Sequence, residues 1–432
     1  MRKRHLGVLA ALLAVGVLAA VPTAGRASAP PEPAAFSVAT TDPQSFASPG
    51  PQPVGQASVL PGWALNGVAP SADGGVLSAT AAQTCDPEAV DGLPPLAVDS
   101  GPCAAVDDAG LYNNARFQFG TAVSPVYSAE AFRRLVASWD ATTSPGTWIE
   151  VHARARIEQS WTRWYSLGVW ASDASTIQRH SIPGQDDAAG AVDVDTLKLS
   201  QPSSTYQLEV TLFTATPGVS PAIRAVSAVT FDPAAGGAAP GSIGAAINLP
   251  VPARSQMLPE YRGLGFGGGG EAWCSPTSVS MIMAYWADVL QRPELRHSVP
   301  TVAQGVYDYV DRKTGTWPFN VAYAVSQGLT GSVARFDSFA ALRPWLDAGV
   351  PVAISFSFAP GQLRGAPIVS SPGHISVVRG FTASGDVIMN DSAVAADGMS
   401  IVYDRTELVR AWQRGSGGIA YLIYPRGWAI PR

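Results

Sequence analysis

A segment built mainly of alanine, glycine and proline, residues 232–245, divides this chain into two parts with different sequence patterns. The segment has the composition of a flexible linker, because small side chains and proline contribute little to a hydrophobic core. Stretches in which apolar and polar residues alternate precede it, and stretches with apolar residues at helical spacing follow it. We therefore expect an all-β domain over residues 59–231 and a domain of helices and strands over residues 246–432.

Residues 148–157 show the clearest strand pattern of the first domain, with apolar and polar residues in alternation. Comparable stretches, separated by turn residues, are 164–170, 195–199, 206–213 and 223–231. Several short strands with regular turns favour a β-sandwich. The large aromatic residues of this domain fit either the sandwich core or a face that stacks on carbohydrate, and they are Trp139, Trp148, Trp161, Trp164, Tyr165 and Trp170.

The N-terminal residues have the order of a secretory signal peptide. In residues 1–29 a basic start precedes an uncharged apolar run and then small residues. An uncleaved membrane anchor is the alternative, and no later stretch is long and apolar enough to span a bilayer. Residues 30–58, rich in proline, alanine and serine, predict a disordered spacer. We expect a secreted, extracellular protein with no membrane segment after signal cleavage.

The second domain is predicted to place its helices before its strands. Helical spacing begins at Cys274 and recurs over residues 302–310, 321–327 and 338–348. Strand patterns follow over residues 351–358, 374–381, 387–391 and 419–424. Helices followed by an antiparallel sheet indicate an α+β fold.

The three cysteines divide into a pair and a single residue. Cys85 and Cys103 lie in a stretch rich in glycine, proline and aspartate, and we expect them to form a disulfide in an oxidising compartment. Cys274 has no such partner and stands where the first helical pattern begins. Because the N-terminus of a helix stabilises a thiolate, Cys274 is the candidate nucleophile.

A thiol nucleophile needs a base and a group that orients the base. His374 opens one predicted strand, and Asp391 ends the next one. The turn between the two strands brings both residues to the same end of an antiparallel sheet. Asn390 is the alternative orienting residue, because neighbouring residues of a strand face opposite sides.

The chemistry-bearing residues of the second domain occur in the order Gln256, Cys274-Ser275-Pro276-Thr277, Gly373-His374 and Asn390-Asp391. This order resembles the papain-like bacteriocin-processing peptidase superfamily, cysteine peptidase family thirty-nine, in its secreted, stand-alone type with an N-terminal β-domain. The resemblance covers residues 249–424. It implies an α+β papain-like cysteine peptidase domain preceded by an all-β sandwich domain.

For the site, the resemblance implies four roles: Cys274 as nucleophile, His374 as general base and acid, Asp391 as the residue that orients the imidazole, and Gln256 as the oxyanion-hole side chain. Two features depart from the family pattern. Ser275 stands where the family commonly has glycine, and Gln256 lies eighteen positions before Cys274. The glycine-rich residues 263–270 between them are either a flap over the substrate or a surface insertion.

These observations predict a secreted cysteine peptidase or amidase that hydrolyses a peptide-like bond through a thioester on Cys274. The expected partner is a peptide or protein substrate, with the cell wall as one candidate source. A net charge of -5 with 14% charged residues gives no reason to expect nucleic acid, and neither a metal nor an organic cofactor is implied.

Two other functions fit the same sequence. One is a cell-wall or glycan-binding protein whose papain-like domain is catalytically degenerate. The other keeps the nucleophile and changes the reaction to acyl transfer or deamidation, because formation of the acyl-enzyme is common to all three reactions.

Overall fold

The computed structural model describes residues 60–77, 103–106, 112, 116–233 and 241–431. The expected signal peptide over residues 1–29, the spacer over residues 30–58 and the cysteine Cys85 lie outside the described residues, so the signal, the spacer and the Cys85–Cys103 disulfide stay predictions. All described residues belong to one compact unit, Ala47–Arg432. Among them, no helix combines the length and the apolar character that a membrane crossing requires.

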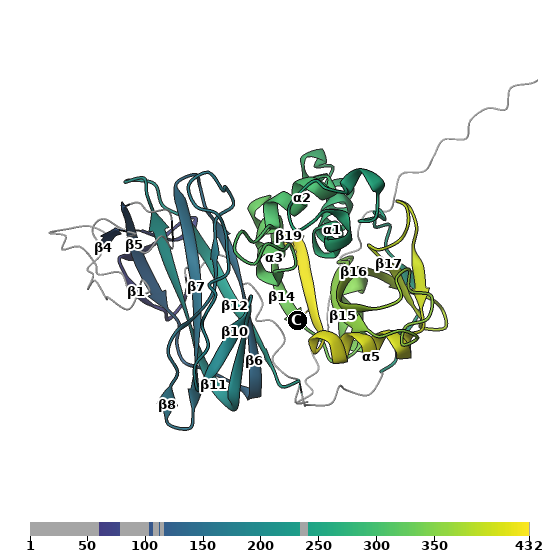
Figure 1. The fold of residues 1–432 in the computed structure, drawn as a ribbon, viewed down its shortest axis with the longest axis horizontal. Helices are drawn as coiled ribbons and strands as arrows, with labels where there is room; N and C mark the ends of the chain where they lie inside the picture. The colour runs from purple at the N-terminus through teal and green to yellow at the C-terminus, as the bar shows by residue number, and fades with distance from the viewer. Residues whose placement is uncertain (1–59, 78–102, 107–111, 113–115, 234–240, 432) are drawn as a thin grey trace, which may run out of the picture. The chain divides into compact units, whose positions relative to one another are not determined.

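Within the described residues, the first domain consists of strands and loops (Figure 1). Its strands are β1 (Ala64–Asn66), β2 (Val68–Ser71), β3 (Gly74–Leu77), β4 (Cys103–Val106), β5 (Arg116–Val123), β6 (Tyr127–Thr142), β7 (Thr147–Ile157), β8 (Ser160–Trp161), β9 (Tyr165–Trp170), β10 (Gly190–Asp193), β11 (Thr196–Thr214) and β12 (Ala222–Phe231). Antiparallel pairing joins these strands, as the alternating sequence patterns led us to expect for an all-β domain.

Strand β11 links two groups of strands. Its residues 209–214 pair with β5 on one side and with β7 on the other, whereas its beginning pairs with β6 and β10. The sequence predicted separate strands over residues 195–199 and 206–213. In the structure, residues 196–199 and 206–213 belong to one strand, β11, and Asp195 directly precedes it. Register shifts between Lys198 and Thr205 bend this strand without ending it. The hydrogen-bonding network is consequently one connected sheet rather than the two separate sheets of a simple sandwich.

Most of the aromatic residues that were candidates for carbohydrate stacking lie in the core. Four of the six are at most 1% exposed, namely Trp139, Trp148, Tyr165 and Trp170. Trp161 and Trp164 are half-buried, and the Arg154 guanidinium lies 4.8 and 4.3 Å from the centroids of their rings. A ligand cannot stack on a buried ring, so the four buried residues serve packing.

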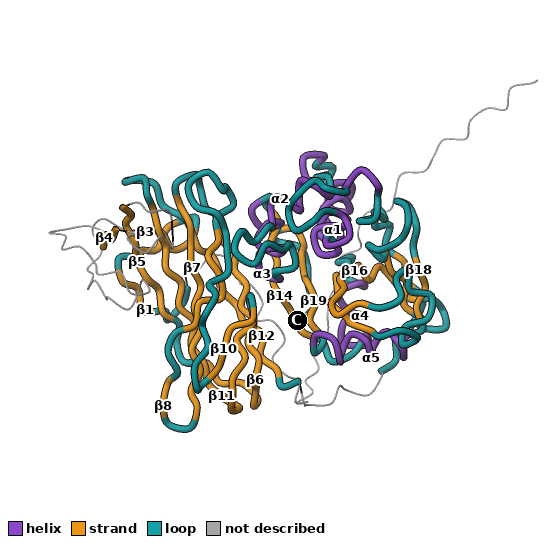
Figure 2. Tube along the Cα trace, viewed as in Figure 1, coloured by secondary structure: helices purple, strands orange, loops and turns teal. Residues whose placement is uncertain are grey.

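The second domain contains all the α-helices of the described part of the chain (Figure 2). The helices are α1 (Cys274–Val289), α2 (Val299–Val306), α3 (Trp317–Ser326), α4 (Phe339–Asp347) and α5 (Arg405–Ser416), with short 3₁₀ helices η2 (Pro259–Tyr261), η3 (Gly270–Ala272) and η4 (Pro293–Leu295). The strands are β13 (Ile247–Asn248), β14 (Leu329–Arg335), β15 (Val352–Phe358), β16 (Ser371–Phe381), β17 (Val387–Asn390), β18 (Ile401–Tyr403) and β19 (Ile419–Pro425).

The seven strands form an antiparallel sheet in the order β14-β19-β15-β16-β17-β18, and β13 also pairs with β16. Helix α1 packs against β16, and α5 packs against β15. These contacts bring the beginning of α1, which carries Cys274, together with β16, which carries His374.

The predicted elements of this domain lie close to the observed ones. The helix expected over residues 302–310 begins at Val299 instead, because the Ser298 hydroxyl caps it by accepting from the Thr301 N–H at 3.3 Å. Strand β14 and helix α5 were not predicted. The sequence did contain a capping signal for α5, because Glu407 follows Asp404 by three residues. In the structure, the Asp404 side chain accepts a hydrogen bond from the Glu407 N–H at 2.9 Å.

A buried carboxylate joins the two domains. Asp140 of β6 is 2% exposed and accepts two hydrogen bonds from Arg426, which follows β19, both at 2.8 Å. Arg224 of β12 donates to the same carboxylate at 2.7 Å. Phe319 of α3 packs against Trp139 of β6, with ring centroids 6.2 Å apart. The domains are therefore in direct contact, although the composition of the linker alone would leave them independent.

The substitution Asp140→Ala is expected to lower the free energy of unfolding by about 2–3 kcal/mol, because it leaves Arg426 and Arg224 without their shared acceptor. Urea unfolding followed by tryptophan fluorescence measures the loss. The matched control is Asp193→Ala, which removes an exposed ion pair with Lys198 and is expected to cost under about 1 kcal/mol. Equal effects of the two substitutions would contradict the structural role of Asp140.

Candidate active site

Cys274 is the first residue of α1, is partly exposed and has a free thiol. The N–H groups of the first turn of a helix have no intrahelical acceptors, and Pro276 fits this turn because it has no N–H. One turn further, the Ser278 hydroxyl donates to the carbonyl of Ile375 at 2.9 Å. This contact fixes the start of α1 against the residue that follows His374.

His374 lies on β16 and is 3% exposed. Its Nε2 atom is 2.7 Å from Asp391 Oδ1 and 3.1 Å from the Ser376 hydroxyl. The Cys274 side chain lies near this imidazole and contributes to the rise of the pKa of His374. Because Asp391 and Ser376 occupy Nε2, the other ring nitrogen, Nδ1, is the one left for the thiol. The imidazole thus lies between a thiol and a carboxylate.

The buried pair His374 and Asp391 favours opposite charges. Burial by itself lowers the pKa of His374, but the negative charge of Asp391, its hydrogen bond and the contact with Cys274 together raise that pKa to about 10. Burial by itself raises the pKa of Asp391, but the charge and hydrogen bond of His374 and the bond from Tyr403 lower it below 3.8. An imidazolium–carboxylate pair is the stable form near neutral pH.

The structure separates the two candidates for the orienting residue. Asp391 faces His374, and its other oxygen, Oδ2, accepts from the Tyr403 hydroxyl at 2.7 Å. Asn390 donates to the Val251 carbonyl at 2.9 Å and accepts from Arg379 at 3.2 Å, so it is occupied on the other side of the strand.

Gln256 lies beside the segments that carry the site. Its backbone N–H donates to the Ser392 carbonyl at 2.7 Å, and its side-chain Nε2 donates to the Glu271 carbonyl at 2.8 Å. A Cβ atom at Gly270 would be 2.0 Å from the Gln256 carbonyl oxygen, so only glycine allows this approach. The glycine-rich segment therefore closes the separation of eighteen residues between Gln256 and Cys274.

The glycine-rich residues 263–270 are attached to the body of the domain. The indole N–H of Trp273 donates to the Phe266 carbonyl at 2.7 Å, and both rings belong to a cluster with Val299 and Ala303. Tyr261 packs against Trp273 with ring centroids 5.7 Å apart and ring planes inclined by 42°. These contacts hold the segment directly before Cys274 against the domain, and its role as a flap stays a prediction.

Two tyrosines at the site were not found from the sequence. Tyr403 supports Asp391, and its position at the start of the 403–408 segment was the available signal. Tyr421 of β19 is buried and lies 2.9 Å from the Ser275 hydroxyl through its own hydroxyl. This contact accounts for Ser275, the residue that departs from the family pattern, since a glycine there would leave Tyr421 without that partner.

The other histidine of this domain is occupied elsewhere. His297 Nδ1 lies 2.6 Å from the Tyr323 hydroxyl, and burial lowers the pKa of His297. Among the described residues, His374 is the histidine in contact with a cysteine and a carboxylate.

A partly exposed thiol on a helix and a buried imidazole and carboxylate on an antiparallel sheet form this candidate site, and comparisons with known proteins give the family of the chain. Residues 76–230 match the model of the peptidase C39 N-terminal domain, and residues 248–419 match the model of the peptidase C39-like family. The chain therefore belongs to the peptidase C39-like family.

Two further comparisons contribute nothing more to the family assignment. A solved structure from Bacillus anthracis, described as that of a C39-like peptidase, is 17% identical, covers 42% of this chain and 98% of its own, and has a TM-score of 0.28. A search of curated proteins returned no match.

The substitution Tyr403→Phe is expected to lower the free energy of unfolding by about 1–3 kcal/mol, because Asp391 Oδ2 loses its buried donor. Thermal and urea unfolding measure the change. The matched control Tyr307→Phe alters a tyrosine whose hydroxyl makes no hydrogen bond with any described residue, and it is expected to change stability by under about 0.5 kcal/mol. If Tyr403→Phe proves neutral, its hydroxyl does not support the carboxylate.

The raised pKa of His374 also predicts a pH dependence of stability. Its contribution is fully present below the unfolded value of 6.5 and is lost as the pH rises through about 10. The stability difference between the wild type and His374→Gln is therefore expected to shrink over this range. His297 has a lowered pKa, so the difference between the wild type and His297→Gln should grow as the pH rises through 6.5. Urea titrations from pH 5 to pH 10 compare the two slopes, and slopes of the same sign would contradict the assignment.

Proposed function

We propose that this protein is a cysteine peptidase or amidase that hydrolyses a peptide-like bond through a thioester, with Cys274, His374 and Asp391 as its triad. The observation that carries the proposal is the buried imidazole of His374, which bonds to Asp391 at 2.7 Å through Nε2 and lies close enough to Cys274 for the thiol to contribute to the raised pKa of His374. The family of the second domain is consistent with this chemistry. We also propose that the second domain has a papain-like fold.

In the first half of the proposed reaction, the Cys274 thiolate attacks the carbonyl carbon of the substrate. The developing oxyanion lies near the free N–H groups of the first turn of α1. An amide nitrogen carries two N–H groups, so Gln256 Nε2 can donate one to the Glu271 carbonyl and offer the other to the oxyanion. His374 then gives its proton to the leaving amine, the carbon–nitrogen bond breaks and the thioester remains.

In the second half, His374 removes a proton from water, and the hydroxide oxygen attacks the thioester carbonyl. The carbon–sulfur bond breaks, the carboxylic acid departs, and the sulfur leaves as a thiolate beside the protonated imidazole. Asp391 holds the imidazole in one orientation throughout and stabilises its positive charge. An amine in place of water would give acyl transfer, so the acceptor depends on access to the thioester rather than on the triad.

The setting of this reaction is also proposed from the sequence. The signal peptide over residues 1–29 supports action outside the cell, where a peptide or protein of the cell surface or cell wall would be the substrate. Cys85 and Cys103 would be paired there, leaving Cys274 as the reactive thiol.

The catalytically degenerate binding protein has less support. A degenerate site would not need to keep a buried charged pair, which is costly unless its geometry is maintained. The aromatic residues that motivated glycan binding are largely buried, with Trp161 and Trp164 as the half-buried exceptions.

Iodoacetamide is expected to alkylate Cys274 in the folded protein at neutral pH, and peptide mapping locates the label. The substitution Cys274→Ala should abolish the label and lower hydrolysis of fluorescein-labelled casein by at least about a thousandfold. Asp391→Asn should slow both reactions while leaving the fold intact by circular dichroism. The control Ser384→Ala, on an exposed turn, should keep the wild-type rates. Unchanged hydrolysis by Cys274→Ala would refute the proposal.

A further inference from the structure

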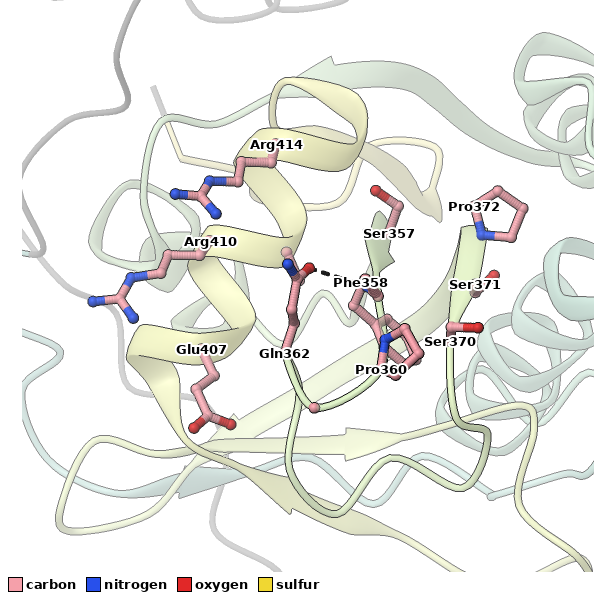
Figure 3. Close-up of a pocket in the computed structure, with 13 residues that line it drawn as sticks. Ser357, Phe358, Pro360, Gln362, Ser370, Ser371, Pro372, Glu407, Arg410 and Arg414 are labelled. Carbon is pink, nitrogen blue, oxygen red and sulfur yellow. Dashed lines mark hydrogen bonds between the residues drawn. The ribbon is translucent and has the colours of Figure 1, made fainter.

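A pocket of about 640 Å³ lies between α5 and the ends of β15 and β16 (Figure 3). Ser357 and Phe358 come from β15, Ser371 and Pro372 from β16, and Gln362 from the loop between these strands. The volume falls within the range of ligand pockets. None of the roles assigned above to the triad or to Gln256 uses this pocket.

The pocket is close to His374 along two routes. Pro372, which lines the pocket, precedes His374 by two residues on β16, a separation of about 7 Å along the strand. In the neighbouring strand, Phe356 contacts the imidazole with ring centroids 5.2 Å apart and stacks on Phe358 at 6.0 Å. Because Phe358 lines the pocket, a peptide at the triad would reach it within a few residues of the bond that is cleaved.

The charges at the pocket are unbalanced. Arg410 and Arg414 lie four residues apart on α5, on one face of the helix, and both are exposed. Neither forms an ion pair with another described residue. The one acidic residue of the lining, Glu407, is already paired, since its two oxygens accept from the Arg364 side chain at 2.6 Å and from the Arg364 N–H at 2.9 Å.

The remaining polar groups of the pocket suit a carboxylate. Gln362 Oε1 accepts from the Ala359 N–H at 3.0 Å, so its amide nitrogen still has two N–H groups to donate. Figure 3 shows the guanidinium groups of Arg410 and Arg414 extending outward from α5, away from Pro372. Their side chains are long and exposed, so rotation about their torsions can bring the charges over the opening.

We propose that this pocket is a substrate subsite that takes an acidic side chain, aspartate or glutamate, of the peptide. The proposal rests on the proposed function, because the subsite serves the reaction at Cys274. Arg410 and Arg414 supply the charge, Gln362 supplies a fixed donor, and Phe358 and Pro372 form the apolar wall. The proposed subsite defines a class of substrate, which the triad alone does not: peptides with an acidic residue near the bond that is cleaved.

The test is a cleavage profile of the full chain on a peptide library derived from a digested proteome, with the new termini read by mass spectrometry. Aspartate and glutamate are expected to be enriched at one position within about four residues of the cleaved bond. For matched peptides, the acidic residue should be preferred over its amide counterpart by about tenfold, as for a charge-assisted hydrogen bond at a partly exposed site. The preference should fall as the ionic strength rises.

The double substitution Arg410→Gln with Arg414→Gln should reduce this preference to near one and leave cleavage of peptides with the amide residue unchanged. The matched control is Arg116→Gln with Arg312→Gln, which changes the net charge equally at two exposed arginines outside the pocket. The control should keep the acidic preference.

Three results would overturn the subsite: no acidic enrichment, enrichment that survives the Arg410 and Arg414 substitutions, or a library left uncleaved by protein whose Cys274 still reacts with iodoacetamide. Failure of iodoacetamide to label Cys274 is a different result, because it refutes the nucleophile itself. Labelling and cleavage measured on the same preparation separate the two failures.

Discussion

The hydrogen bond between His374 Nε2 and Asp391 Oδ1 is the contact on which the arrangement of the site depends. Both groups are buried, so each keeps its charge because the other is present. The second carboxylate oxygen, Oδ2, accepts from the Tyr403 hydroxyl, and Oδ1 also accepts from the Ala393 N–H. With Nε2 committed in this way, the imidazole is held in one orientation, and Nδ1 remains available to the thiol at the start of α1.

The first domain also contributes a residue, Asp195, to the surroundings of the site. Asp195 accepts from the N–H of Trp317, the first residue of α3, at 2.6 Å, and burial raises the pKa of Asp195 to about 7. Burial above all raises the pKa of Tyr421, and the charges of Asp195 and Cys274 add to this effect. Since Tyr421 bonds to Ser275, this carboxylate of the β-domain lies near the residue that follows the candidate nucleophile. The β-domain is thus part of the surroundings of the site.

Reactivity and selectivity are assigned to different elements of the second domain. The thiol, the base and the carboxylate come from α1, from β16 and from the residue after β17, which long-range packing holds together. The proposed subsite comes from α5 and the loop between β15 and β16, which are partly exposed and can vary without disturbing the buried pair. Such a division lets substrate preference change while the triad geometry stays fixed.

The sequence by itself determined the all-β and mixed character of the two domains, the order of most elements, and the residues Cys274, His374, Asp391 and Gln256 as candidates. Periodicity and reactive residue types are local properties, so one chain is enough to identify them. Only the tertiary structure decided that Asp391 rather than Asn390 meets the imidazole, that Gly270 packs against the backbone of Gln256, and that Tyr403 and Tyr421 bond to Asp391 and Ser275. These outcomes depend on side-chain direction and on contacts between residues far apart in the chain, which no local pattern contains.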